Sequence, residues 1–153
     1  MKNRHTSRLT VVKRKKVDPK VGQVAEGKKL KFQGEEHICA DELKTFVFNS
    51  DTQQINIETA EFSAVCPFSG LPDIAKVKIK YYPLTKKALE LKALKYYFLS
   101  FRNVGIYQEG VTKRIFEDLK KVLNHGCITV ETIYNTRGGI DVVCIEDGIS
   151  KIK

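Results

Sequence analysis

The chain has 153 residues, 42% of them hydrophobic and 29% charged, which predicts one soluble globular domain. Its formal net charge is +9 at pH 7, and residues 1–31 account for all of it, with eleven Lys or Arg against Asp18 and Glu26. No run approaches the roughly 18 apolar residues of a membrane-spanning helix. The basic N-terminus also lacks the apolar stretch of a secretory signal, so we expect a cytoplasmic protein with no membrane partner.

Residues 1–36 are interpreted as a basic N-terminal arm, flexible in part, and residues 37–153 as the folded domain. Within the arm, residues 9–12 have the composition of a short strand. A cationic segment of this kind can contact nucleic acid or another polyanion. A solvated tail is the slightly favoured alternative, because residues 1–31 contain no aromatic side chain to stack on bases.

Two strands and a loop are predicted first along the chain. Residues 55–59 alternate apolar and polar side chains, which is typical of a half-buried strand. Residues 62–73 contain two prolines and a glycine within six positions and predict a loop. Val77, Ile79 and Tyr81 alternate with lysines at 76, 78 and 80. We therefore expect a strand with one buried face and one cationic face, ended by Pro83.

Two helices and two strands follow. Residues 85–101 predict a helix with Thr85 as its N-cap, and residues 109–123 predict a second helix that ends at Asn124. Strands are expected at 128–134 and 140–145, around a glycine-bearing hairpin. This order indicates an α+β domain in which helices cover one face of an antiparallel sheet. The strand edges need cover, and pairing with neighbouring subunits into a closed barrel is one solution.

Cys66 is the first candidate for chemistry. The chain has three other cysteines, Cys39, Cys127 and Cys144, and the last two lie in apolar stretches typical of buried thiols. Cys66 instead lies in the predicted loop, which closes with Asp73 seven residues later. A loop thiol beside a carboxyl group can act as a nucleophile next to a proton donor, although this spacing also arises often by coincidence.

Three further candidates each have a structural alternative. Lys92 and Lys95 lie one turn apart on a predicted helix. They could form an anion site for a phosphate, or they could belong to an ordinary solvated helix face. Glu109 can accept hydrogen bonds from a guanine-type edge, or it can simply stabilise a helix N-terminus. Arg137 lies beside two glycines, where a phosphate could approach, or it is a plain hairpin arginine.

Metal and dinucleotide motifs are missing from the sequence. His37 with Cys39 and His125 with Cys127 do not make a four-ligand set, so no metal is expected. No Gly-rich loop of the Rossmann or Walker type occurs, so a nicotinamide cofactor would have to bind without a Rossmann domain.

Several stretches together resemble one family. They are Cys66-Pro67-x-x-Gly70-x-Pro72-Asp73, the segment 90–97 (ELKALKYY), the segment 100–103 (SFRN), Glu109, and the segment 136–139 (TRGG). In this order they resemble the NADPH-dependent 7-cyano-7-deazaguanine reductases of queuosine biosynthesis, the QueF type, from about residue 55 to residue 146. The segment 90–97 is the most specific part, since it is similar to the signature that separates these reductases from GTP cyclohydrolase I.

The resemblance implies a tunnelling fold: a four-stranded antiparallel sheet with two helices on one face, assembled into rings with sites between subunits. It implies that Cys66 attacks the nitrile carbon to form a thioimide and that Asp73 supplies the proton. It also implies substrate-binding residues, in which Glu90 and Glu109 read the polar edge of the base, and cofactor-binding residues for the NADPH phosphates. The first set is Leu89, Glu90, Leu91, Gln108 and Glu109, and the second is Lys92, Lys95 and Arg137. Gln108 stands where many members have histidine and others tyrosine.

The implied activity is NADPH-dependent reduction of 7-cyano-7-deazaguanine to 7-aminomethyl-7-deazaguanine. Two alternatives stay open at this point. Archaeal relatives keep the Cys and the Asp but form an amidine with ammonia on the nitrile base within tRNA, which the basic arm favours. A non-catalytic purine-binding or RNA-binding module on the same fold is the other.

Overall fold

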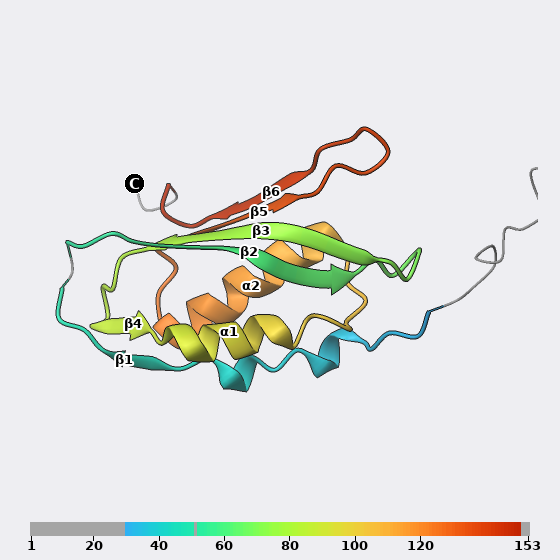
Figure 1. Ribbon diagram of the computed structural model, residues 1–153. Helices are drawn as coiled ribbons and strands as arrows, with labels where there is room; N and C mark the ends of the chain where they lie inside the picture. The colour runs from blue at the N-terminus through green and yellow to red at the C-terminus, as the bar shows by residue number, and fades with distance from the viewer. Residues whose placement is uncertain (1–29, 51, 151–153) are drawn as a thin grey trace, which may run out of the picture.

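The computed structural model describes residues 30–50 and 52–150 (Figure 1). A four-stranded sheet forms one layer, α1 and α2 cover one of its faces, and a small two-stranded sheet lies beside the helices. The predicted α+β class is thereby confirmed. In chain order the elements are η1 (Glu35–His37), η2 (Ala40–Glu42), β1 (Thr45–Val47), β2 (Ile55–Val65), β3 (Pro72–Tyr81), β4 (Lys87–Leu89), α1 (Leu91–Leu99), α2 (Gln108–Leu123), β5 (Ile128–Tyr134) and β6 (Val143–Asp147).

The four-stranded sheet has the order β2-β3-β5-β6, and all neighbouring strands are antiparallel. The expected alternation in β3 is confirmed: Val77, Ile79 and Tyr81 are buried on the helix side, and the intervening lysines point away. This alternation fixes the register, because a slip of one residue would turn the lysines towards the core.

The loop predicted at residues 62–73 is shorter than expected. β2 continues to Val65 and β3 begins at Pro72, so the loop spans residues 66–71. The register shifts between Thr59 and Phe62, which is a β-bulge. The bulge interrupts the period of two after Thr59, and for this reason the sequence pattern ended the strand too early.

The helix predicted at residues 85–101 starts later, and Thr85 is not its N-cap. Residues Lys87–Leu89 form β4, which pairs with β1. The cap is Glu90, whose carboxylate accepts hydrogen bonds from the backbone N–H groups of Lys92 and Ala93, both at 3.0 Å. The strand partner at residues 45–47 was not recognised in the sequence, so helix-forming side chains dominated the prediction.

The second helix agrees with the sequence pattern, and the last strand is displaced. α2 ends at Leu123, and Asn124 is its C-cap with a φ of 59°. The strand expected at residues 140–145 lies at Val143–Asp147, because Arg137 and Ile140 pair first and close a two-residue turn. The short strand expected at residues 9–12 lies outside the described residues.

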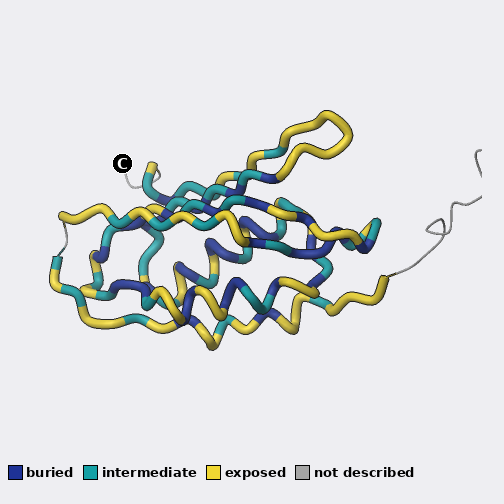
Figure 2. The backbone as a smooth tube through the Cα atoms, in the orientation of Figure 1, coloured by how far each residue is buried: buried dark blue, intermediate teal, exposed yellow. Residues whose placement is uncertain are grey.

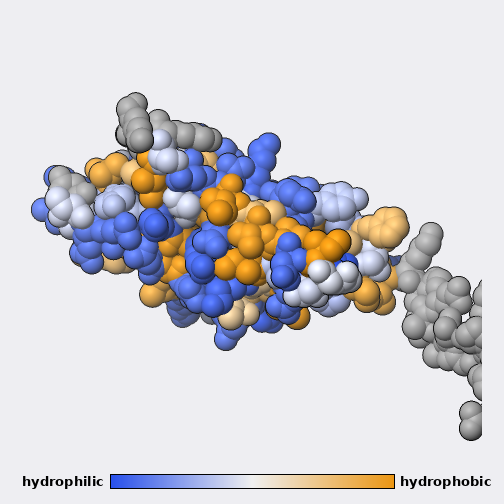
Figure 3. All heavy atoms as spheres, turned by 90° about the horizontal axis from the view of Figure 1, so that it is seen from above, coloured by the Kyte–Doolittle hydropathy of each residue, from blue (hydrophilic) through white to orange (hydrophobic). Residues whose placement is uncertain are grey.

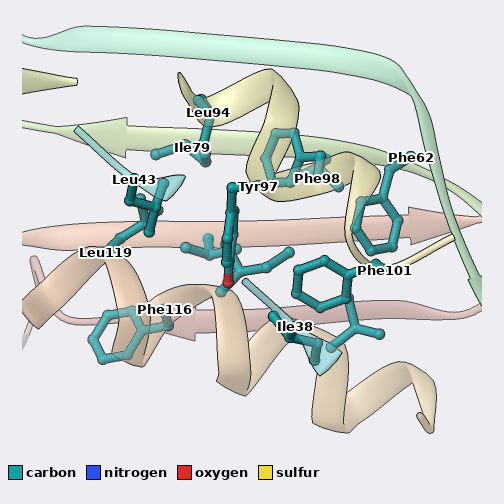
Figure 4. Packing of buried hydrophobic residues seen from close by; sticks show 14 of the residues in the cluster. Ile38, Leu43, Phe62, Ile79, Leu94, Tyr97, Phe98, Phe101, Phe116 and Leu119 are labelled. Atoms are coloured by element: carbon teal, nitrogen blue, oxygen red, sulfur yellow. The ribbon is translucent and has the colours of Figure 1, made fainter. Parts of the chain in front are cut away.

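An aromatic cluster joins the two helices to the sheet (Figure 4). Tyr97 of α1 and Phe101, in the turn that follows the end of α1 at Leu99, are fully buried, with ring centroids 5.2 Å apart. Phe62 of β2 packs edge-on against Phe101 at the same distance. The Tyr97 hydroxyl donates a hydrogen bond of 2.8 Å to Asp118 of α2, and Asp118 also pairs with Arg114. This part-buried polar contact connects α1 to α2 beside the core.

The opposite face of the sheet is left uncovered (Figures 2 and 3). Hydrophobic side chains gather there in the view from above, and Ile74, Val143 and Ile145 are among the exposed ones. Among residues 30–50 and 52–150 there is no helix with the length and apolar character to cross a bilayer.

The contact between Tyr97 and Asp118 leads to a stability prediction. Replacing Tyr97 with Phe keeps the ring but removes a part-buried hydrogen bond to the Asp118 carboxylate, so we expect the free energy of unfolding to fall by about 1–2 kcal/mol. The neighbouring Tyr96 is half exposed, and Tyr96→Phe is the matched control, expected to change stability by less than about 0.5 kcal/mol. Urea unfolding measures both. Equal midpoints for the two variants would contradict this account of the core.

Candidate functional site

Cys66 begins the short loop between β2 and β3. Its backbone N–H donates to Leu71 O at 2.9 Å, and its carbonyl accepts from Gly70 N at 2.8 Å. Gly70 has a φ of +70°, a left-handed conformation that suits glycine. The end of β2 is held in turn by Val65, which exchanges backbone hydrogen bonds with Val104 and Ile106 at 2.9 and 3.1 Å. The thiol therefore sits on a closed loop fixed to the segment that leads into α2.

The environment of Cys66 favours the thiolate. A hydrogen bond from the Ser69 hydroxyl lowers the pKa of the Cys66 thiol, and the backbone N–H groups of Ser69 and Phe68 and the Arg137 side chain act in the same direction. Burial opposes this effect, but the pKa is lowered overall. Burial raises the pKa of Cys127 and Cys144, in agreement with their expected structural role. Among the thiols with a shifted pKa, Cys66 alone is activated.

Asp73 lies across from this loop at the start of β3. Its side chain is only 3% exposed, and it forms an ion pair with Arg137 Nη1. Arg137 comes from the hairpin between β5 and β6, and its own side chain is 45% exposed. Because Asp73 pairs with Ala64 of β2 in the sheet register, the nucleophile and the carboxyl group lie at the same end of the β2–β3 hairpin.

A cleft of about 290 Å³ brings these groups together. The start of α2 contributes Gln108 and Glu109 to its wall, and Glu109 occupies the first helical turn with an exposed side chain. The cleft is lined by Cys66, Asp73, Tyr107, Gln108, Glu109, Asn135, Arg137, Ile140 and Val142. A thiol with a lowered pKa, a buried carboxyl group and a hydrogen-bond acceptor thus share one opening.

The remaining predicted site residues lie elsewhere in the same chain. The N–H of Leu89 donates to the Tyr81 hydroxyl at 3.0 Å, so it lies at the far end of β3 from Asp73. The eight residue steps between Asp73 and Tyr81 correspond to about 25 Å. Glu90 caps α1 at that end, and exposed residues of α1 follow it. One of these, Lys95, forms an ion pair with Glu61. Those exposed residues are Leu91, Lys92 and Lys95.

Several residues at the cleft were not identified in the sequence. Tyr107 and Ile140 flank the opening and are 62% and 67% exposed. Asn135, Val142 and Ser69 also belong to the surroundings of Cys66 and Asp73. Their closeness in the sequence to predicted site residues was the signal that could have identified them. Tyr107 precedes Gln108, Ser69 lies in the Cys66 loop, and the others lie within five residues of Arg137. Among the described residues, no group of three or more His, Cys, Asp or Glu side chains is placed to hold a metal ion.

Comparison with known proteins gives consistent sequence matches. A family model described as QueF-like protein matches residues 72–151. Proteins of Thermotoga petrophila and Thermotoga maritima, each named NADPH-dependent 7-cyano-7-deazaguanine reductase, are 60% identical over 116 residues, which is 76% of this chain and 85% of theirs. A protein of the same name from Caldicellulosiruptor bescii is 44% identical over 109 residues, covering 70% of this chain and 82% of its own length.

A solved structure agrees at the level of the fold. The apo form of the archaeosine synthase QueF-Like matches with a TM-score of 0.59 and 22% identity, over 65% of this chain and 97% of that one. At this identity the likeness concerns the fold alone, and it agrees with the tunnelling fold implied by the motifs. The family model covers more than half of this chain, and the relatives that are 60% identical match over most of their own length. The chain therefore belongs to the QueF-like family, together with the relatives named NADPH-dependent 7-cyano-7-deazaguanine reductase.

Proposed function

We propose that this protein reduces the nitrile of 7-cyano-7-deazaguanine to the primary amine of 7-aminomethyl-7-deazaguanine, with NADPH as the reductant. The single observation that carries the proposal is the shared cleft of Cys66 and Asp73 in a chain 60% identical to reductases of that name. We take the cytoplasm to be the location of the protein.

The residue types suit the chemistry of a nitrile. The carbon of a nitrile is a modest electrophile, and addition of the Cys66 sulfur converts it to a thioimide, which divides a difficult reduction into easier steps. The nitrile nitrogen gains a proton as the sulfur adds, and Asp73 is the buried carboxyl group on the same cleft that delivers it. The chemistry that NADPH supplies when bound is hydride transfer, twice for each amine.

Recognition of the base is assigned to the two groups of residues described above. Glu109 accepts hydrogen bonds from the adjacent N–H and NH₂ groups of the deazaguanine, with Gln108 beside it. Glu90 reads the same edge, with Leu89 and Leu91 flanking it. In the single chain, the Glu90 carboxylate is engaged by backbone N–H groups of α1, and each of its oxygens retains a further lone pair for a ligand.

The chain offers side chains that fit the phosphates of NADPH. Lys92 and Lys95 are exposed on α1, and Lys92 Nζ lies 6.0 Å from the centre of the Tyr96 ring, which presents an exposed aromatic surface beside the two cations. Arg137 adds a third cation that is 45% exposed at the cleft. Lysine and arginine side chains are common phosphate donors in proteins.

We further propose that the working site forms between copies of this chain in a homo-oligomeric ring. Cys66 and Glu90 lie at opposite ends of β3 in one chain, so one copy does not supply both groups to the same small base. β2 and β6 leave free strand edges, and the uncovered face of the sheet carries exposed Ile74, Val143 and Ile145. Free edges and apolar patches of this kind are covered by partner subunits in many proteins.

The first prediction of this proposal concerns the covalent intermediate. Mixing the protein with 7-cyano-7-deazaguanine in the absence of NADPH should give a mass increase equal to one molecule of the nitrile, because the thioimide forms before hydride transfer. Cys66→Ala should abolish this adduct and turnover while leaving the unfolding midpoint unchanged. Cys39→Ser, which removes an exposed thiol, is the matched control and should form the adduct normally. An adduct located by peptide mapping on Cys39, Cys127 or Cys144 would refute the assignment.

A second candidate substrate is the nitrile base within tRNA, which the charge of residues 1–31 favours. Deleting these residues removes all of the net positive charge. If the substrate is the free base, NADPH-dependent reduction should survive the deletion. If it is tRNA, affinity should fall with the arm, and each neutralised phosphate should add about 0.9 to the logarithmic salt slope for a duplex.

Titration of labelled tRNA at two salt concentrations, with the full chain and the shortened chain, distinguishes the two substrates. Tight, salt-sensitive binding that depends on the arm, together with no NADPH consumption on the free nitrile, would overturn the reductase proposal. The amidine-forming reaction on tRNA would then be the better description.

A further inference from the structure

Arg137 shares the cleft with both reacting groups. Its guanidinium forms an ion pair with the buried Asp73 side chain, and it is one of the groups that lower the pKa of the Cys66 thiol. The ion pair joins the hairpin between β5 and β6 to the start of β3, so it fixes where the buried Asp73 side chain lies in the cleft.

The backbone fixes Arg137 in this position. Arg137 and Ile140 exchange two backbone hydrogen bonds of 3.0 Å, and they close a two-residue turn at Gly138 and Gly139, whose φ angles are 57° and 78°. Positive φ at both central residues is the conformation of a tight hairpin turn that glycine adopts readily. The base of the hairpin is tied to β3, because Asn135 N donates to Ile74 O at 3.1 Å, one residue after Asp73.

We propose that Arg137 is a positioning residue: its ion pair holds the Asp73 carboxyl group at the Cys66 end of the cleft, where Asp73 can relay the proton of the thiol to the nitrile nitrogen. The inference rests on the proposed function and deepens it. It assigns Arg137 a part in the addition step, before any hydride transfer and separate from contact with a cofactor phosphate.

The addition step balances without an outside proton. The S–H bond of Cys66 and one C–N π bond of the nitrile break, while an S–C bond and an N–H bond form. Asp73 accepts the proton from sulfur, releases it to nitrogen and returns to the carboxylate paired with Arg137. A thiol with a lowered pKa transfers its proton more readily to such a base.

Four titratable or charged groups surround Asp73. Cys66 faces it from the loop after β2 and Arg137 from the hairpin, while Glu109 lies on α2 and Tyr134 on β5. Burial raises the pKa of Tyr134 well above its usual range, so this phenol stays neutral near pH 7. Among the residues that line this cleft, Arg137 is the one basic side chain, and it lies with the carboxyl groups of Asp73 and Glu109 and the thiol of Cys66.

The test measures adduct formation with 7-cyano-7-deazaguanine in the absence of NADPH. We expect Arg137→Gln to slow adduct formation roughly 10-fold to 100-fold through misplacement of Asp73. Arg137→Lys, which keeps the charge, should restore part of the rate. Lys121→Gln removes one positive charge from an exposed position at the other end of α2 and should have no effect. A residue that only binds the cofactor would leave this reaction unchanged.

A double-mutant cycle asks whether Arg137 acts through Asp73. Asp73→Asn should slow adduct formation by about 10² to 10⁴, the usual range for a positioned acid or base. The double variant with Arg137→Gln should be no slower than Asp73→Asn alone, since the two residues act as one unit. Rates that multiply independently would show that Arg137 does not act through Asp73.

The pH dependence of Cys66 alkylation by iodoacetamide gives a readout that needs no substrate. In a Cys39→Ser background, loss of Arg137 should move the alkylation profile to higher pH, because a contribution that lowers the thiol pKa is removed. An unchanged profile together with wild-type adduct formation in Arg137→Gln would overturn the inference. If the wild type itself formed no adduct, the proposed function would fail, and the alkylation profile would still decide whether Arg137 tunes Cys66.

Discussion

The antiparallel pairing of β2 with β3 is the interaction on which the site depends. The two strands are joined by a loop of only six residues, and the hydrogen bond from Cys66 N to Leu71 O closes it. A tight connection between antiparallel neighbours leaves no freedom in where the first loop residue and the second strand residue lie. Cys66 and Asp73 are therefore brought to one end of the sheet by backbone geometry, before any side-chain contact is made. The hairpin between β5 and β6 then brings Arg137 to the same end.

The same pairing underlies the proposal that the working site forms between copies of this chain. β3 is a strand of ten residues, and its far end is where the Tyr81 hydroxyl accepts a hydrogen bond from Leu89 N. Residues attached to that end cannot reach Cys66 without breaking the sheet. The free edges of β2 and β6 provide a way to unite the two ends in an assembly. Association through edges also removes the exposed backbone donors and acceptors that would otherwise favour aggregation.

Local patterns in the sequence predicted most of the sheet and the second helix. The alternation in β3 and the helical spacing in α2 are strong signals, because each follows from burial of one face. The predicted start of α1 was wrong, because residues Lys87–Leu89 form β4 instead. β4 is stabilised by its partner β1, about forty residues earlier in the chain, and no local pattern reveals such a partner. The bulge after Thr59 hid half of β2 for a related reason. For the site, the loop placement of Cys66 was predicted correctly, whereas the pairing of Asp73 with Arg137 depends on a register between strands that are sixty residues apart.

In the proposed reaction, the thiol of Cys66 makes a nitrile reducible by NADPH. The most direct measurement follows NADPH absorbance while the full-length protein acts on free 7-cyano-7-deazaguanine, with the amine product quantified in the same sample. We expect two molecules of NADPH to be consumed for each amine formed, and none with Cys66→Ala. NADPH consumption by the Cys66→Ala variant at the wild-type rate, or no consumption by the wild-type protein, would contradict the proposed reaction.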